Sequence, residues 1–136
     1  GGIAGIGGNI TGCYSTGTVS GAEYVGGIAG YIYSGYITNC AALNPTVTAL
    51  TSGAGRVVGD IYGSGSSSGN IAYAGMTPGD GGVTFTTDTR NAGTGKSAGD
   101  LSTKAAYTGL GWDFDTVWEM GPGNGTYSNL PILKWQ

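Results

Sequence analysis

The chain has 136 residues, enough for one domain with a modest core and too few for two domains of ordinary size. Glycine occurs 30 times, but there are only 4 prolines and no three-residue period, which excludes a collagen-like chain. With 39% hydrophobic residues, a net charge of −3 and no basic cluster, the composition excludes a disordered chain and a nucleic-acid-binding surface, and no apolar run reaches the roughly 18 residues of a membrane span.

Residues that commonly carry catalysis or bind metals are scarce. The chain has no histidine, which is the commonest general base and transition-metal ligand. Its two cysteines, Cys13 and Cys40, are too few to make a zinc site alone. We therefore expect no cofactor, no metal and no enzymatic activity. The abundance of Thr, Ser, Gly and Tyr with few charges is typical of an extracellular or cell-surface protein.

A pattern of short apolar motifs recurs along the first 76 residues. The segment Gly2-Ile-Ala-Gly-Ile6, followed by Gly8-Asn-Ile-Thr-Gly-Cys-Tyr14, recurs as Gly27-Ile-Ala-Gly-Tyr31 followed by Gly35-Tyr-Ile-Thr-Asn-Cys-Ala41. A weaker third copy begins Arg56-Val-Val-Gly-Asp60 and continues as Gly69-Asn-Ile-Ala-Tyr73, after a Gly/Ser insertion at residues 63–68. This alignment places Ile3, Ile28 and Val57 at one position, and Cys13, Cys40 and Ile71 at another.

The spacing of the copies, 25 to 31 residues, suits one coil of a β-solenoid, in which each circuit lays short strands on those of the circuit before. Each half-motif is too short for helical periodicity. Glycine is expected at the corners, since it accepts a positive φ. We predict an all-β fold, a right-handed parallel β-solenoid (β-helix) of about three coils with a C-terminal cap containing a short helix.

The repeated pattern resembles a known family. Gly-Ile-Ala-Gly, a variable turn, Gly-x-Ile-Thr-x-Cys-Tyr/Ala and the following Ser-Thr-Gly-Thr-Val resemble the GLUG repeat of bacterial surface proteins, adhesin-like proteins and some immunoglobulin A peptidases. The resemblance covers residues 1–76, and the Trp-rich tail resembles the segment that closes such arrays. It implies a noncatalytic extracellular module that acts as a stalk, a scaffold or an adhesin.

Residues 77–136 are predicted to hold the last strands and the cap of the same domain. Ser97-Ala-Gly-Asp100 fits a capping box, which opens a short helix over residues 98–107. Trp112 and Trp118 give the tail a large apolar surface. Because the last coil of a stack needs cover, we expect this tail to form a lid over it.

The start of the array has no such lid in the sequence. The first coil would expose unpaired backbone groups, which proteins normally cover. We expect upstream repeats, or self-association with another molecule through this coil, to cover it. An alternative function is therefore a subunit of a head-to-tail extracellular filament.

Four tyrosines of the repeats are candidate ligand contacts: Tyr14, Tyr31, Tyr33 and Tyr36. An aromatic strip could stack on glycans or on a host surface, so a carbohydrate-binding solenoid is a further alternative. Asp113 and Asp115 have the spacing of paired carboxylates in a carbohydrate-active enzyme, but we favour two solvent-facing acids beside a buried Phe114.

Two further features concern covalent chemistry. Asn9 and Asn124 each fit the N-glycosylation sequon. Cys13 and Cys40 fall at equivalent places in adjacent coils, within reach of a disulfide, but parallel side chains make its dihedrals awkward. We favour two buried thiols, because free cysteine packs as a small hydrophobic residue.

Overall fold

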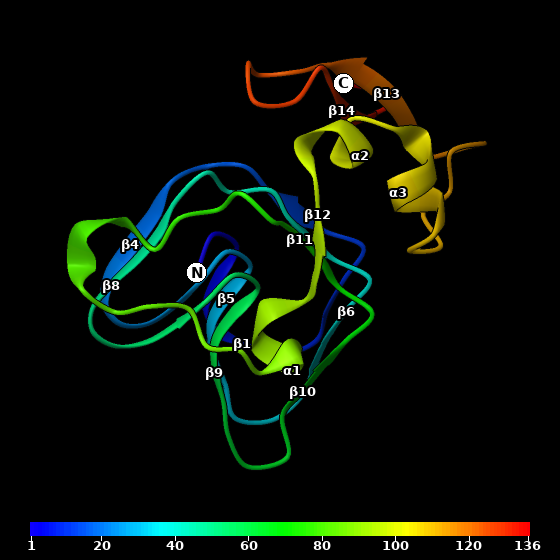
Figure 1. The fold of residues 1–136 in the computed structure, drawn as a ribbon. Helices are drawn as coiled ribbons and strands as arrows, with labels where there is room; N and C mark the ends of the chain where they lie inside the picture. The colour runs from blue at the N-terminus through cyan, green and yellow to red at the C-terminus, as the bar shows by residue number, and fades with distance from the viewer.

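The computed structural model describes all of residues 1–136, and it consists mainly of short strands joined by turns (Figure 1). The strands are β1 (Ala4–Gly7), β2 (Ile10–Thr11), β3 (Tyr14–Ser15), β4 (Val19–Gly26), β5 (Ala29–Ile32), β6 (Tyr36–Thr38), β7 (Ala41–Ala42), β8 (Val47–Gly55), β9 (Val58–Ile61), β10 (Ser66–Ser68), β11 (Ile71–Tyr73), β12 (Thr94–Lys96), β13 (Trp118–Pro122) and β14 (Asn129–Leu133). The helices are η1 (Gly79–Gly81), α1 (Thr89–Ala92), α2 (Ala98–Leu101) and α3 (Lys104–Thr108).

Strands at the same place in successive repeats pair in parallel. The sheets have the orders β1-β5-β9, β2-β6-β10, β3-β7-β11-β12 and β4-β8. We call residues 1–26 the first circuit, residues 27–55 the second and residues 56–76 the third. Their blue, cyan and green traces follow one another around the same outline in Figure 1. The predicted predominance of strands and the parallel sheets are therefore confirmed.

The backbone stacks in the predicted register at the first motif. The N–H of Ile3 donates to the carbonyl of Ile28, and the N–H of Ile28 donates to the carbonyl of Val57, each at 2.9 Å. Ile28 and Val57 are fully buried, whereas Ile3, in the outermost strand layer, is 43% exposed. The predicted column is therefore confirmed.

The third repeat differs from the alignment by one residue. Ile71 pairs with Ala41, so Asn70 occupies the position of Cys13 and Cys40. The amide of Asn70 suits this buried corner, because its Oδ1 accepts from the N–H of Cys40 at 2.8 Å and its Nδ2 donates to the carbonyl of Ile37 at 2.9 Å. The alignment that placed Ile71 in the cysteine column is therefore wrong.

Most of the Gly/Ser run of the third repeat is not an insertion, because the link from β9 to β10 is only one residue longer than that from β5 to β6. Ser66–Ser68 form β10, which pairs with Tyr36–Thr38 of β6. Ser67 thus takes the place of Ile37 and is itself buried. A serine run lacks the apolar alternation that marks a strand, so the pattern concealed it.

Glycine has two different roles in the repeats. Gly12, Asn39 and Gly69 precede the cysteine position in each circuit and all have positive φ, of 62°, 55° and 64°. Glycine takes this corner in two circuits, as predicted, and asparagine takes it in the other. Gly27 of the Gly-Ile-Ala-Gly motif does lie in a bend, between β4 and β5. The glycines of this motif do not have positive φ, however, so the reason predicted for their use is wrong.

The motif glycines instead allow close approach of backbones. A Cβ on Gly27 would lie 2.3 Å from Oδ1 of Asn44, and one on Gly30 would lie 2.5 Å from the carbonyl oxygen of Tyr24. Both distances are too short for any side chain. The missing Cβ therefore explains Gly27 and Gly30.

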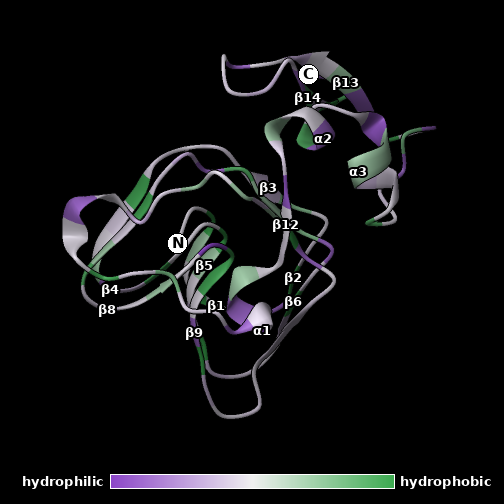
Figure 2. Ribbon diagram, in the orientation of Figure 1, coloured by the Kyte–Doolittle hydropathy of each residue, from purple (hydrophilic) through white to green (hydrophobic).

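The interior of the circuits is apolar. Figure 2 shows hydrophobic positions on β4, β5 and β9 and polar or neutral loops between strands. The buried cluster consists of Val25, Ile28, Ala29, Ile32, Ile37, Cys40, Ala42, Val47, Ala49, Ala54, Val57, Val58, Ala72 and Met76. Most of these residues come from the second and third circuits, which have a neighbour on each side.

Residues 77–96, which we call the closing segment, cover the third circuit and the end of β8. Thr77 bridges to Thr46 and Phe85 to Ala54, and β12 pairs with β11. The side chain of Asn91 donates to the carbonyls of Val58 and Gly59, at 3.2 and 3.3 Å. The edge of β9 is thus covered by an amide rather than by a strand.

The C-terminal tail, residues 97–136, packs on the side of the circuits and not over their end. In Figure 1, α2, α3, β13 and β14 lie outside the outline that the circuits share. The apolar cluster beneath the tail is made of Ala41, Leu43, Ile71, Leu101, Tyr107, Leu110, Trp112, Phe114, Tyr127 and Leu130. The predicted lid is therefore in the wrong place, because the closing segment already covers the end and sheet β3-β7-β11 offers an apolar outer face.

The capping motif in the tail was predicted correctly, whereas the position of the tail was not. The capping box of Ser97 and Asp100 is present, which confirms that prediction. The single helix predicted over residues 98–107 is two short helices, α2 and α3, because Ser102 and Thr103 interrupt it. Both hydroxyls donate to backbone carbonyls of the preceding turn, which competes with helix continuation.

Candidate functional site

The four predicted tyrosines do not form one strip. Tyr14 lies under the tail, with its ring 6.2 Å from that of Trp112 and 6.0 Å from that of Trp118. It therefore belongs to the packing of the tail. Tyr36 is on β6 and is 43% exposed. Tyr31 is in β5, and Tyr33 is the first residue after this strand.

Two other tyrosines complete an aromatic surface around this pair. The rings of Tyr24 and Tyr31 are 5.5 Å apart and tilted by 45°, and those of Tyr33 and Tyr62 are 6.3 Å apart and nearly parallel, at 24°. We call Tyr24, Tyr31, Tyr33 and Tyr62 the tyrosine surface. The sequence analysis missed Tyr24 and Tyr62, although the repeat alignment, in which Tyr31 falls beside Asp60, places Tyr62 close to Tyr33.

A groove opens beside this surface. It has a volume of about 310 Å³ and is lined by Gly5, Ile6, Glu23, Tyr24 and Tyr31, from β1, β4 and β5. Ile6, which pairs with Tyr31 across the sheet, is 78% exposed. The groove therefore combines two aromatic rings, one aliphatic side chain and one carboxylate.

The charge around the groove is negative. Glu23 lines it, and Asp60 pairs with Tyr31 from the neighbouring strand β9. Desolvation, and then the Asp60 carboxylate and the neighbouring tyrosines, raise the pKa of Tyr31 above its usual value. The hydroxyl of Tyr31 therefore stays protonated and can donate a hydrogen bond. No lysine or arginine lines this groove.

The backbone at Tyr24 is unusual. Its φ is 51°, in the left-handed region, and it follows a β-bulge, since the register of β4 with β8 shifts between Gly21 and Glu23. The residue opposite in the second circuit is Gly53, with a φ of 66°. Bulges of this kind redirect a side chain. A bulky residue in this conformation costs about 1–2 kcal/mol, which glycine avoids.

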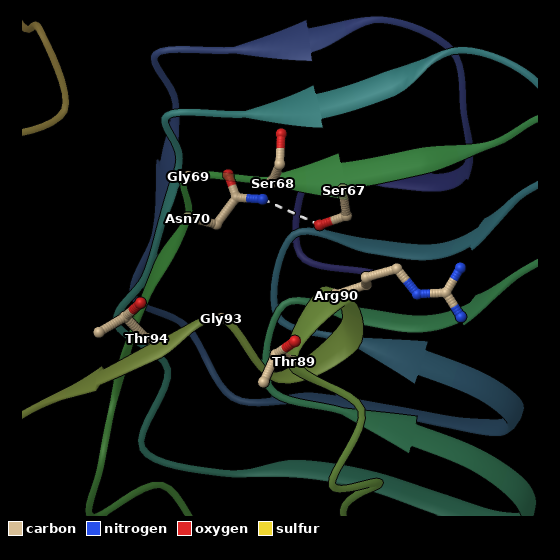
Figure 3. A pocket seen from close by; sticks show the side chains of 8 residues that line it. All are labelled: Ser67, Ser68, Gly69, Asn70, Thr89, Arg90, Gly93 and Thr94. Atoms are coloured by element: carbon tan, nitrogen blue, oxygen red, sulfur yellow. Dashed lines mark hydrogen bonds between the residues drawn. The ribbon is translucent and has the colours of Figure 1, made fainter.

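A larger cavity, of about 600 Å³, lies between β10 and α1 (Figure 3). It is lined by Ser67, Ser68, Gly69, Asn70, Thr89, Arg90, Gly93 and Thr94. It exists because the closing segment passes from α1 to β12 without a strand beside β10.

Three polar side chains of this larger cavity, those of Ser67, Asn70 and Arg90, are engaged within the fold. Figure 3 shows the hydrogen bond from Asn70 Nδ2 to Ser67 Oγ, which measures 2.9 Å, and the side chain of Arg90 extending away from Asn70 and Thr94. Arg90 pairs with Asp88 at 2.7 Å. We assign no ligand to this cavity.

The acidic pair of the tail organises a turn. The Oδ1 of Asp113 accepts from the N–H groups of Asp115 and Thr116, at 2.8 and 2.9 Å, and Oδ2 accepts from the hydroxyl of Thr116. These hydrogen bonds lower the pKa of Asp113. No group of three His, Cys, Asp or Glu side chains comes together to form a metal site.

The sequon asparagines and the cysteines have distinct environments. Asn9 and Asn124 are both exposed, and their Oδ1 atoms accept from the N–H groups of Tyr36 and Tyr127, at 3.3 and 3.4 Å. Cys13 and Cys40 are free thiols, the first half-buried and the second buried. Burial raises the pKa of Cys40 to about 11.

Comparison with known proteins places one repeat in a family. The family model of the GLUG motif matches residues 21–48, which run from β4 of the first circuit into β8 of the second. This match confirms the resemblance seen in the sequence. The searches of curated proteins and of solved structures returned no match. No helix of the structure is both long and apolar enough to span a membrane.

Proposed function

We propose that this chain with its GLUG motif is a noncatalytic structural module of a bacterial surface protein, serving outside the cell as a stalk, scaffold or adhesin. In this proposal the three circuits are coils of a right-handed parallel β-solenoid. The observation that carries it is the unbroken register through Ile3, Ile28 and Val57, because strands stacked in this way build a rigid rod from repeated sequence.

The two ends of the stack differ, and this difference supports a role within a longer assembly. Residues 77–96 cover the third circuit, whereas β1 and β2 are the outer strands of their sheets. Ile3 is 43% exposed on this side. Open strand edges beside apolar side chains favour pairing with further strands. We propose that another coil, from upstream repeats or a second molecule, covers the first circuit.

A head-to-tail filament is the alternative. In it, the first circuit of one copy would stack on the third circuit of the next. The closing segment opposes this contact, since β12 and Asn91 already occupy the edges of β11 and β9. Of the strands of the third circuit, β10 keeps a free edge, and β12 is the outer strand of its own sheet at this end. We therefore favour a module that extends in one direction.

Duplication of one circuit tests the module. A second copy of residues 27–55 inserted after Gly55 would again present the Asn39 and Leu43 carbonyls that the tail binds. We expect cooperative unfolding, an unchanged β signature in circular dichroism, and a stack longer by about 4.8 Å in X-ray scattering. The control is a Gly/Ser linker of equal length at the same site. A duplicate that is unfolded, while the variant with the linker stays folded, would contradict the proposal.

The cellular location needs its own test. Lys104 and Lys134 are exposed and so available to a membrane-impermeant amine reagent. We expect labelling of both in intact cells of the source organism. Labelling that requires cell lysis would contradict an extracellular location.

A further inference from the structure

We propose that the tyrosine surface and its groove bind a neutral oligosaccharide. One sugar ring stacks on Tyr24 and Tyr31 with a hydroxyl bonded to Glu23, and the next ring stacks on Tyr33 and Tyr62. This inference rests on the proposed function in one respect: the tyrosine surface must be exposed on an adhesin-like module.

The first argument is the strained backbone of Tyr24. At the equivalent position of the second circuit the left-handed conformation is taken by Gly53. Stability alone would favour glycine at both places, because a side chain there adds strain. A Cβ on Gly53 would lie 2.6 Å from Cδ1 of Tyr24, so the ring of Tyr24 lies directly over that glycine. Strain that the fold does not require is typical of functional positions.

The side chains of the tyrosine surface are exposed to solvent. Tyr24, Tyr33 and Tyr62 are 38%, 58% and 64% exposed, and Ile6 beside them is 78% exposed. These side chains contribute little to the core. Their rings nevertheless come together from β4, from the end of β5 and from the loop after β9. Such convergence on the surface indicates contact with a partner.

The third argument concerns the chemistry of that partner. The rings of Tyr24 and Tyr31 are already in contact at 5.5 Å, so they leave no space between them for an ammonium group and offer an open wall instead. An open aromatic wall fits the C–H face of a pyranose ring. A second, nearly parallel pair next to it suits a ligand of at least two units.

The charge of the groove also limits which sugars can bind. The groove carries the carboxylate of Glu23, with that of Asp60 beside Tyr31, and has no cationic lining residue. A carboxylate accepts hydrogen bonds from sugar hydroxyls. It also repels sialic and uronic acids, since like charges disfavour binding. The proposed ligand is therefore uncharged.

The experiment measures binding of cellotriose, chitotriose, mannotriose and lactose to the intact chain by NMR titration and calorimetry. Sialyllactose serves as the acidic probe and tetramethylammonium chloride as the cationic probe. We expect at least one neutral sugar to bind and to shift the amide resonances of Tyr24 and Tyr31, with no binding of either charged probe. No binding of any neutral sugar, or preferential binding of tetramethylammonium, would overturn the proposal.

Three variants test the assigned contacts. Tyr62→Ala and Glu23→Gln should each weaken the sugar that binds by about tenfold. Tyr24→Gly should weaken it by at least about tenfold while leaving the urea midpoint unchanged or higher, because it removes strain along with the ring. Tyr36→Ala, at an exposed tyrosine outside the surface, should not change affinity.

The variants also distinguish failure of the sugar-binding proposal from failure of the proposed structural role. A Tyr24→Gly protein that unfolds more easily would show that Tyr24 serves the fold, and would overturn the argument from strain. Duplication of residues 27–55 repeats Tyr31 and Tyr33 and is judged by folding alone, while sugar binding is measured on the unaltered chain. A duplicate that folds, together with no sugar binding by the unaltered chain, would reject only the binding site.

Discussion

The hydroxyl of Tyr127 donates a hydrogen bond to the carbonyl oxygen of Leu43, 84 residues earlier, at 2.8 Å. Both residues are buried, and burial raises the pKa of Tyr127. A similar bond at 2.8 Å joins the indole N–H of Trp112 to the carbonyl of Asn39. The tail is therefore attached to the second circuit by polar contacts as well as by apolar packing.

Substitution of Tyr127 by Phe removes that bond and little else. The carbonyl of Leu43 would lose its partner in a buried place, which should lower the free energy of unfolding by roughly 1–3 kcal/mol. Urea titration followed by tryptophan fluorescence measures the loss. Tyr36→Phe, at an exposed hydroxyl, should change it by less than about 0.5 kcal/mol. Equal effects of the two changes would show that the Leu43 contact does not stabilise the fold.

Removal of the Trp112 side chain should be more damaging. Trp112 is 6% exposed and packs against Tyr14, Tyr107 and Trp118. We expect Trp112→Ala to lower the free energy of unfolding by about 3–5 kcal/mol. Trp135→Ala, at a residue 68% exposed, should have almost no effect in the same urea titration. An unchanged midpoint for Trp112→Ala would mean that the tail does not hold the circuits.

Two glycines at the same position of the repeat make a matched pair. A Cβ on Gly30 would lie 2.5 Å from the carbonyl oxygen of Tyr24 and 2.7 Å from that of Gly5, whereas one on Gly5 would meet nothing within 4 Å. Gly30→Ala should therefore destabilise the protein by roughly 1–3 kcal/mol or more. Gly5→Ala should be neutral or stabilise by up to about 1 kcal/mol. Thermal unfolding of both variants should show this difference, and equal melting temperatures would contradict the close stacking at Gly30.

The amide of Asn70 should be necessary for the third circuit. Asn70→Ala leaves the N–H of Cys40 and the carbonyl of Ile37 without partners in the interior. With about 1–3 kcal/mol for each buried unpaired group, we expect a loss of at least about 2 kcal/mol. Hydrogen exchange should show faster exchange of the Cys40 amide in particular. Asn124→Ala, at an exposed asparagine, is the control, and unaltered protection of Cys40 would refute the role given to Asn70.

Alkaline pH should weaken the fold through Cys40. Burial raises the pKa of this thiol from 9.0 to about 11, so the folded state favours the protonated form. Its contribution is complete below about pH 9 and is lost as the pH rises through about 11. Urea midpoints at about pH 8 and about pH 10.5 should therefore differ, and Cys40→Ala should show a smaller difference. An equal fall in both proteins would assign the effect to other groups, such as Tyr107 and Tyr127.

Much of the repeat could be predicted because its constraints are local. The spacing of Gly27-Ile-Ala-Gly from its first copy located the column of Ile3, Ile28 and Val57. The use of glycine with a positive φ at corners was also predicted, although its place at Gly12 was not. At both places few other residue types could occupy the same position in a stacked turn.

Other features could not be predicted, because distant partners determine them. Asn70 replaces a cysteine by using side-chain hydrogen bonds that only the folded corner reveals. Ser67 is buried in β10 although nothing in its neighbours predicts a strand. Tyr14 looked like a surface tyrosine because its cover, Trp112, lies almost a hundred residues later.

Packing of the tail on the side of the circuits affects the order in which the protein folds during its synthesis. Residues 107–130 pack against side chains from the first circuit to the third, so the outer face of sheet β3-β7-β11 stays uncovered until residues 107–130 have been synthesised. Contacts of such long sequence separation form slowly. A nascent chain that lacks these residues would therefore leave Tyr14, Leu43 and Ile71 open to solvent, and the docking of residues 107–130 onto this face would be a late step of folding.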